Sequence, residues 1–145
     1  MSNSDHPRNG ALFQQQVCKW FEKEYGKRFI LEKKIAIGFD PNNRKDHKFD
    51  IAAEDGSIVI ECKRYTWTET GNVPSAKMGF TNEAAFYLSF LDEPTEKYIV
   101  MLYSYNARRG ETLAEYYYRT NNHLLKNTKI AEYNPDTDLL QLVGM

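Results

Sequence analysis

Two carboxylates and a lysine in one short stretch are the residues of this chain best suited to chemistry. Asp50, Glu61 and Lys63 lie in HKFDIAAEDGSIVIECKRYTW. Two neighbouring acids can hold Mg²⁺, which takes only one or two protein carboxylates and keeps several waters. Such an ion activates water and screens phosphate charge, while a lysine can orient the water or move a proton. The pattern indicates metal-assisted hydrolysis if the fold brings these side chains together.

A hairpin between the acids would do so. The pair Asp55-Gly56 predicts a type I′ turn, in which both central residues need positive φ. With the turn there, Asp50 lies directly opposite Glu61, and Lys63 shares their face because strand side chains alternate. Like charges that face each other destabilise a sheet by up to roughly 1 kcal/mol. The pair therefore needs a compensating cation, which is Lys63, a bound metal or both.

The opposite face of this hairpin is expected to be apolar and to pack on a helix. Its cross-strand pairs are Phe49 with Cys62, Ile51 with Ile60, and Ala53 with Ile58. A slip of one residue would exchange the two faces, so this pattern supports the same register. The plainer alternative is a solvated surface hairpin that carries exposed Glu and Lys side chains.

The remaining periodicity predicts the elements around the hairpin. They are a helix over Gly10–Tyr25 capped by Gly26, a strand over Phe29–Ile37, a loop over Gly38–Lys45, mostly loop over Thr66–Gly79, a helical stripe from Phe80 to Leu91, a buried strand over Lys97–Tyr105, a helix over Glu111–Leu125, and two short strands around Asn134-Pro135-Asp136. Strands joined first by hairpins and then by a helical crossover imply an α/β protein with a mixed central sheet flanked by helices.

Composition bounds the class of protein. The chain has 145 residues, 41% of them hydrophobic and 27% charged, which fits one globular domain over 1–145 with a flexible tail over 1–9. No apolar run reaches the length of a membrane span, and the N-terminus lacks an apolar signal region, so a cytoplasmic location is expected. Cys18 and Cys62 are expected to be buried free thiols.

The net charge of −1 argues against a coat protein that binds nucleic acid without specificity. A local basic rim remains compatible with it. The residues that would form it are Arg44, Lys45, Lys48, Lys63 and Arg64, and the candidates for binding nucleic acid are Arg44, Lys45, Lys48, Arg64 and Lys77. Their alternative is ordinary solvated surface. Tyr65 and Trp67 follow the acids and are candidates either for stacking on bases or for the core, and His47 is expected to be a surface residue.

Asp50 and the run Glu61-Cys62-Lys63 resemble the motif of the PD-(D/E)xK nuclease superfamily. The element order from Gly10 to about Tyr105 is also similar to the αβββαβ core of its restriction-endonuclease-like fold. The resemblance implies Mg²⁺-dependent cleavage of DNA, with Mn²⁺ as a substitute. Asp50, Glu61 and the backbone carbonyl of Cys62 would bind the metal, and Lys63 would assist the attacking water.

The chain departs from that motif in two places. Phe49 stands where many members carry proline. The first helix offers Gln14 or Gln15 where members often carry a metal-binding glutamate, and an amide binds Mg²⁺ more weakly than a carboxylate does. In the helix after the motif, Lys77, Asn82 and Glu83 are candidates for an auxiliary polar role.

The leading hypothesis is a small metal-dependent DNA endonuclease. The alternative is a nuclease-fold module that binds DNA or a protein partner and cleaves nothing, which the glutamines in the first helix favour. A third idea is a subunit that forms a homodimer through the helix carrying Tyr116-Tyr117-Tyr118. Three consecutive helical residues point about 100° apart, so they cannot all face inward.

Overall fold

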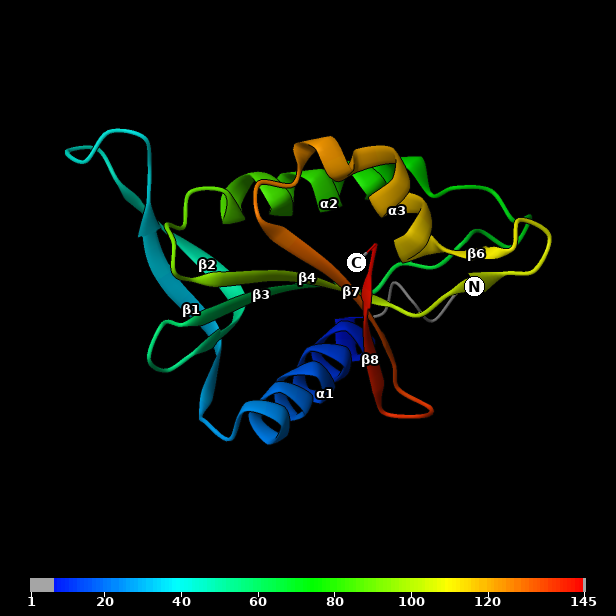
Figure 1. Cartoon of the computed structure of the whole chain (residues 1–145), viewed down its shortest axis with the longest axis horizontal. Coiled ribbons are helices and arrows are strands. Elements are labelled where there is room, and N and C mark those ends of the chain that lie inside the picture. The colour runs from blue at the N-terminus through cyan, green and yellow to red at the C-terminus, as the bar shows by residue number, and fades with distance from the viewer. Residues whose placement is uncertain (1–6, 145) are drawn as a thin grey trace.

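The computed structural model describes residues 7–144 (Figure 1). Its helices are α1 (Pro7–Tyr25), α2 (Ser75–Leu88) and α3 (Leu113–Asn121), the last continued by the 3-10 turn η2 (Asn122–Leu124). Its strands are β1 (Phe29–Ile37), β2 (Lys45–Ala53), β3 (Ile58–Lys63), β4 (Glu96–Leu102), β5 (Tyr105–Asn106), β6 (Glu111–Thr112), β7 (Thr128–Asn134) and β8 (Leu139–Val143). The order of elements predicted from the sequence is confirmed.

Six strands form one mixed sheet in the order β1-β2-β3-β4-β7-β8. The outer neighbours pair antiparallel, whereas β3 pairs parallel with β4 and β4 parallel with β7. Parallel neighbours need a crossover connection. The chain provides one through α2 and one through α3. The molecule is therefore an α/β protein with a mixed sheet and three helices.

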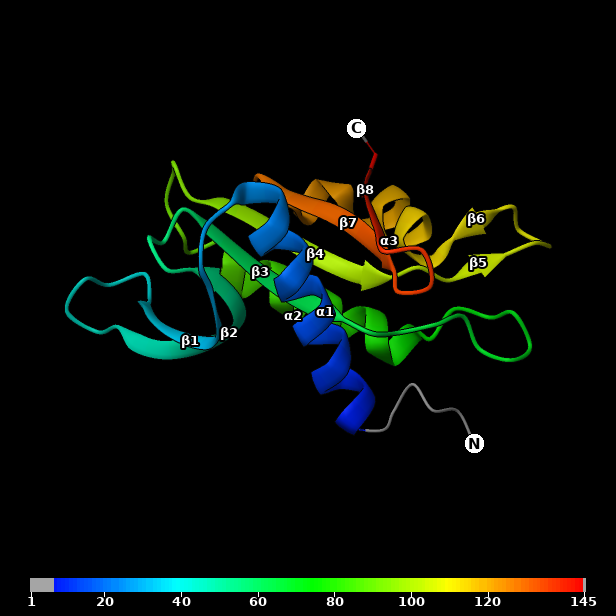
Figure 2. The same cartoon turned by 90° about the horizontal axis from the view of Figure 1, so that it is seen from below.

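Helices cover both faces of the sheet. α2 and α3 lie on one face and α1 on the other, where it crosses the strands in Figure 2. Each face has its own hydrophobic core. Phe13, Val17 and Phe21 of α1 pack on one face, while Leu88 of α2 and Tyr117 of α3 pack on the other. β4, which is buried along nearly its whole length, separates the two cores.

α1 begins at Pro7, earlier than the expected Gly10. Proline is tolerated in the first turn of a helix, where its missing N–H would have no partner. The prediction of a tail over 1–9 is thus wrong for residues 7–9, and its remainder, 1–6, lies outside the described residues. At the other end Gly26 has φ 62° and its N–H donates to the carbonyl oxygen of Glu22, as expected for a C-terminal cap.

α2 begins directly after Pro74, so the expected loop up to Gly79 is wrong over its last residues. Gly79 is accommodated inside the helix. The buried face consists of Met78, Thr81, Ala84, Ala85 and Leu88. Phe80, expected to open the apolar stripe, is instead 52% exposed. The helix is set by packing against the sheet, which outweighs the cost of one glycine.

The hairpin has the predicted register but a different turn. Ile51 pairs with Ile60, as expected. Gly56 has φ 78°, whereas Asp55 is not in the positive-φ region, so the turn is not type I′. The N–H of Gly56 donates to Ala53, and the Asp55 carboxylate accepts from the N–H of Ser57. The loop has four residues instead of the expected two. Lengthening it by one residue on each side leaves the same residues opposite each other in the two strands.

β2 bends at Asp50, and the bend overturns one assignment of faces. Its pairing with β1 is interrupted between Leu31 and Lys33, where Glu32 has φ 53°. Phe49, just before the bend, packs in the core under α2. Ile51, just after it, packs in the core under α1. Phe49 was expected to share the face of Ile51. Strict alternation fails because the backbone twists at the interrupted position.

The C-terminal half adds one feature that was not expected. β4 ends at Leu102, before the predicted Tyr105, and the chain then forms the short ribbon β5–β6. The ribbon lies beside the loop that precedes α2, and the Asn106 amide donates to the carbonyl oxygen of Gly71. The predicted terminal strands are present as β7 and β8. No helix within the described range is long and apolar enough to cross a membrane.

Candidate active site

The two candidate carboxylates lie where β2 and β3 separate. Their pairing ends at Ile51 and Ile60, one step before Asp50 and Glu61. Each acid then reaches across to the backbone of the other strand. The N–H of Cys62 donates to Asp50 Oδ2 at 2.7 Å, and the N–H of Asp50 lies 3.4 Å from Glu61 Oε2. The side chains thereby replace the ladder hydrogen bonds that the separation removes.

Glu61 occupies an unfavourable place for a charged group. It is only 6% exposed. Burial raises its pKa well above the ordinary value, and the neighbouring Asp50 raises it further, whereas Lys63 acts in the opposite direction. A neutral side chain could bond the backbone N–H without this cost. The use of two acids here favours a site that gains stability when a cation arrives.

His47 completes the surroundings of Glu61, which the sequence did not predict. Its Nε2 lies 3.3 Å from Glu61 Oε1, and its ring stacks on Tyr87 of α2 at 3.9 Å between centroids. Burial lowers the pKa of His47, while Asp50 and Glu83 act in the opposite direction. The expected surface position is wrong because the bend at Asp50 reverses the face on which His47 lies. No local sequence signal indicates that bend.

The first helix contributes Gln14. Its side-chain amide donates to the backbone carbonyl oxygen of Asp50 at 2.8 Å. Gln15 is exposed to solvent. Of the two glutamines left open by the sequence, Gln14 therefore adjoins the carboxylates, where it holds the backbone at the bend.

Lys63 lies on β3, one pleat beyond Glu61, and is half-buried. In the parallel ladder it is level with Met101, as Glu61 is with Ile99. Its charge lowers the pKa of Glu61, so the ammonium group acts on the carboxylate. The structure thus brings Asp50, Glu61 and Lys63 to one place, as the register predicted.

The donor set suits a hard, hydrated ion. No cluster of three or more His, Cys, Asp or Glu side chains suited to a metal occurs in the part of the chain that the structure describes. Two carboxylates supply oxygen ligands, and Mg²⁺ typically keeps several waters. Asp50 and Glu61 therefore fit Mg²⁺ or Mn²⁺ better than Zn²⁺, for which nitrogen and sulfur ligands would be expected.

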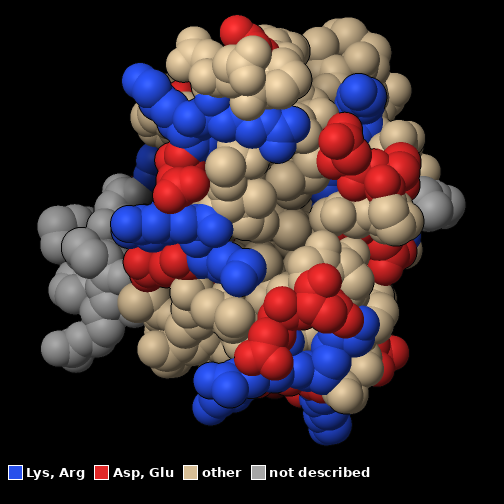
Figure 3. All heavy atoms as spheres, turned by 90° about the vertical axis from the view of Figure 1, so that its left-hand side faces the viewer, with Lys and Arg blue, Asp and Glu red and all other residues tan. Residues whose placement is uncertain are grey.

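The predicted basic residues come from several elements. Arg44 and Lys45 are exposed near the start of β2, Lys48 pairs with Glu32 at 3.3 Å, and Lys77 lies over the ring of Tyr65 at 5.4 Å. Arg64 is half-buried, and its Nη1 has no hydrogen-bond partner within the described residues. Figure 3 shows acidic and basic side chains interspersed around an uncharged, hollowed strip. On that face the basic side chains do not form one continuous surface.

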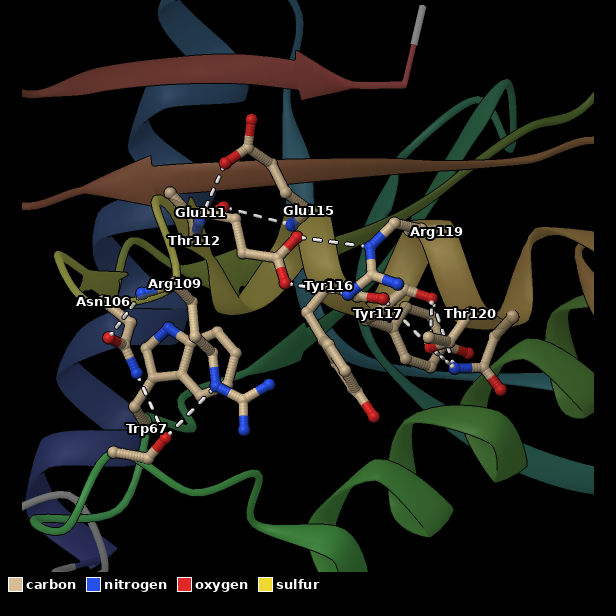
Figure 4. Close-up of polar contacts among 12 residues, drawn as sticks. Trp67, Asn106, Arg109, Glu111, Thr112, Glu115, Tyr116, Tyr117, Arg119 and Thr120 are labelled. Atoms are coloured by element: carbon tan, nitrogen blue, oxygen red, sulfur yellow. Dashed lines mark hydrogen bonds and ion pairs between the residues drawn. The ribbon is translucent and has the colours of Figure 1, made fainter.

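Trp67, beyond the motif, belongs to the core, and Figure 4 shows it with its neighbours. Trp67 is 8% exposed and donates from Nε1 to the carbonyl oxygen of Ser104. The guanidinium of Arg109 lies 4.9 Å from the centroid of the Trp67 ring, and Tyr116 packs edge-on to the same ring at 5.7 Å. Of the two readings of Trp67, core packing is the one the structure supports.

The tyrosine helix offers little free aromatic surface. Tyr117 is fully buried and donates to Asn82, while Tyr116 and Tyr118 are half-buried against their own chain. The homodimer through this helix stays a prediction, but the exposed aromatic surface that suggested it is small.

Comparison of the chain with models of known protein families, with curated proteins and with solved structures found no match.

Proposed function

We propose that this protein is a metal-dependent endonuclease that hydrolyses phosphodiester bonds in DNA. The supporting observation is the pair Asp50 and Glu61 at the separation of β2 and β3, with Lys63 one pleat along. We also propose that the elements from α1 to β4 form a core of the PD-(D/E)xK type.

Each residue has a role in this proposal. Asp50 and Glu61 would hold Mg²⁺ together with the backbone carbonyl of Cys62. The ion, when bound, would supply positive charge that activates water and stabilises charge on the phosphate. Lys63 orients the attacking water or moves its proton. Gln14 keeps the backbone of Asp50 in place, and His47 holds one oxygen of Glu61.

The proposal predicts different consequences for the acid and the lysine. Asp50→Ala should lose both Mn²⁺ binding and nicking of plasmid DNA, because it removes a ligand. Lys63→Ala should keep Mn²⁺ binding and lose activity by about 10²–10⁴-fold, the range for removing a group that transfers a proton. Calorimetric Mn²⁺ titration and plasmid nicking in Mg²⁺ or Mn²⁺ measure the two effects.

Asp136→Ala and Lys129→Ala are matched controls, since both residues lie on the terminal hairpin away from the acids. Both should behave as the unchanged protein does. Failure to bind any divalent ion, together with no cleavage of duplex, junction, flap or RNA substrates, would refute the enzyme.

A second candidate is a module that binds DNA or a protein partner and does not cleave. It is favoured by Gln14, which lies in the first helix, where members of the resembled superfamily often carry an acidic ligand, and donates its amide to the backbone of Asp50. It predicts DNA binding in EDTA that Mg²⁺ does not convert into cleavage. Retained binding in the Asp50→Ala variant, with no product from the unchanged protein, would favour this module.

A further inference from the structure

An aromatic pocket adjoins the candidate active site. It lies between the β1–β2 loop and the C-terminal end of α2 and has a volume of about 490 Å³. Its walls include Phe86 and Tyr87 of α2 and Phe90 just after that helix, with Asn43 and His47 on the opposite side. This volume is within the usual range for small-molecule sites.

The aromatic side chains leave ring surface open to solvent. Phe39, on the loop beside the pocket and not part of its lining, is 85% exposed and packs edge-on to Phe90 with 4.5 Å between centroids. Phe86 is 53% exposed and is also edge-on to Phe90. In an edge-to-face pair the edge of one ring covers one face of the other, so the remaining exposed faces stay available to a flat ligand.

The loop that carries Phe39 is closed at its base. A Cβ placed on Gly38 would lie 3.0 Å from the backbone oxygen of Asn43. Glycine thus permits the two ends of the loop to approach each other. The close approach holds Phe39 beside α2.

His47 belongs to both the pocket and the candidate active site. One face of its ring stacks on Tyr87, which lines the pocket, and its Nε2 lies 3.3 Å from Glu61. Lys45 lies at the pocket wall, and the exposed Arg44 precedes it. A phosphate beside these cations and a base among the aromatic rings would match the two ends of one nucleotide.

We propose that this pocket holds an unpaired nucleobase of the nucleic acid that occupies the candidate active site. The inference rests on the proposed function and adds the substrate class, because a base inside a duplex is already stacked and cannot enter. The base can come from a single-stranded segment or be extruded from a duplex.

The test measures binding in EDTA, which keeps it independent of cleavage. Three labelled DNAs are compared by fluorescence anisotropy: a single strand, a duplex with a short single-stranded flap, and a fully paired duplex. A 2-aminopurine in the single strand and the flap reports stacking by loss of its fluorescence. The unchanged protein should quench both probes.

Phe86→Ala should weaken binding of the single strand and the flap by about 5- to 150-fold, the range for losing one stacked base, and should abolish quenching. Phe80→Ala is the matched control. It lies on the same helix with nearly equal exposure, 52% against 53%, outside the pocket. Phe39→Ala provides a second variant whose side chain contributes little to the folded core, and it should act as Phe86→Ala does.

Equal effects of Phe86→Ala and Phe80→Ala, absence of quenching, or no binding of any of the DNAs would overturn the inference. The two proposals can fail separately. Binding and quenching that depend on Phe86, without cleavage in Mg²⁺ or Mn²⁺, would support the pocket and refute the enzyme. Cleavage that Phe86→Ala leaves unchanged on all three DNAs would support the enzyme and refute the pocket.

Discussion

At the scale of single residues, this molecule places acids where neutral groups would cost less. Asp50 and Glu61 bond to backbone N–H groups that an amide or hydroxyl could also satisfy. The unfavourable burial of Glu61 follows from its low exposure and from the second carboxylate beside it. Such a pair gains stability from a bound cation, and this is the physical basis of the proposed metal site.

Glu132 is a second buried acid and gives a prediction that does not depend on any metal. It is 7% exposed, and its Oε2 has no hydrogen-bond partner among residues 7–144. Burial raises its pKa above the ordinary value of 4.5, while a hydrogen bond with Thr112 acts in the opposite direction. The folded state therefore binds a proton more tightly than the unfolded state does.

With that sign, the stability that Glu132 contributes is present below pH 4.5 and is lost as pH rises toward the folded-state pKa. Glu132→Gln should remove this loss. Urea unfolding between pH 4 and pH 8 should show the free energy of unfolding of the variant rising relative to that of the unchanged protein as pH rises. If instead the free energy of unfolding of the variant fell further below that of the unchanged protein as pH rises, the charged carboxylate would be stabilised by its surroundings.

At the scale of elements, two glycines in helical segments have opposite backbone requirements. Gly26 ends α1 with φ 62°, whereas Gly79 lies inside α2 without a positive φ. A Cβ would meet nothing within 4 Å at either position. The backbone angle alone therefore distinguishes the two sites.

Gly26→Ala should lower the free energy of unfolding by about 1 kcal/mol, because an L-residue is strained in the left-handed region. Gly79→Ala should raise it by about 0.5–1 kcal/mol, because alanine loses less backbone entropy in a helix. Each substitution serves as the other's control in urea denaturation. Changes of the same sign would contradict the assignment of one of the two backbone conformations.

The start of α3 is fixed by a capping box (Figure 4). Thr112 Oγ1 accepts from the N–H of Glu115, and the Glu115 carboxylate accepts from the N–H of Thr112. Thr112→Ala should cost about 1 kcal/mol in urea unfolding. Thr120→Ala in the same helix should cost less, since that hydroxyl bonds only within its own helix, where it donates to backbone carbonyl oxygens and accepts from the side-chain amide of Asn121. Equal costs would show that the box adds nothing to stability.

At the scale of the whole molecule, charge is nearly balanced. The net charge is −1, and acidic side chains lie among the basic ones on the face in Figure 3. Affinity for DNA would then depend on a few local contacts, since phosphate neutralisation supplies most non-specific affinity.

If three cationic side chains near the site each neutralise one phosphate, the logarithm of the association constant should fall linearly with the logarithm of the salt concentration. The slope should be about −3. Arg44→Gln and Lys45→Gln should each reduce that slope by about 1. Lys27→Gln is the control, because Lys27 pairs with Asp55 at the hairpin turn. An unchanged slope in both test variants would place the DNA elsewhere on the surface.

The sequence alone determined the register of the hairpin and the class of the fold. The hairpin register followed from the alternation of apolar and polar side chains along the two strands. The pairing that joins Ile51 with Ile60 also brings Asp50 toward Glu61. The mixed sheet with flanking helices followed from periodicity and from the order of the elements. These properties are local or depend on simple alternation, so no tertiary contact was needed to predict them.

Tertiary structure decided what alternation cannot describe. The bend of β2 at Asp50 moved Phe49 to the other core and turned His47 toward Glu61. It arises from an interrupted pairing with β1 at Glu32, a residue with no sequence signal for positive φ. Packing likewise chose Gln14 over Gln15, buried Trp67, and placed Phe39 beside Phe90. Each outcome depends on contacts between segments far apart in the chain, which a local pattern does not encode.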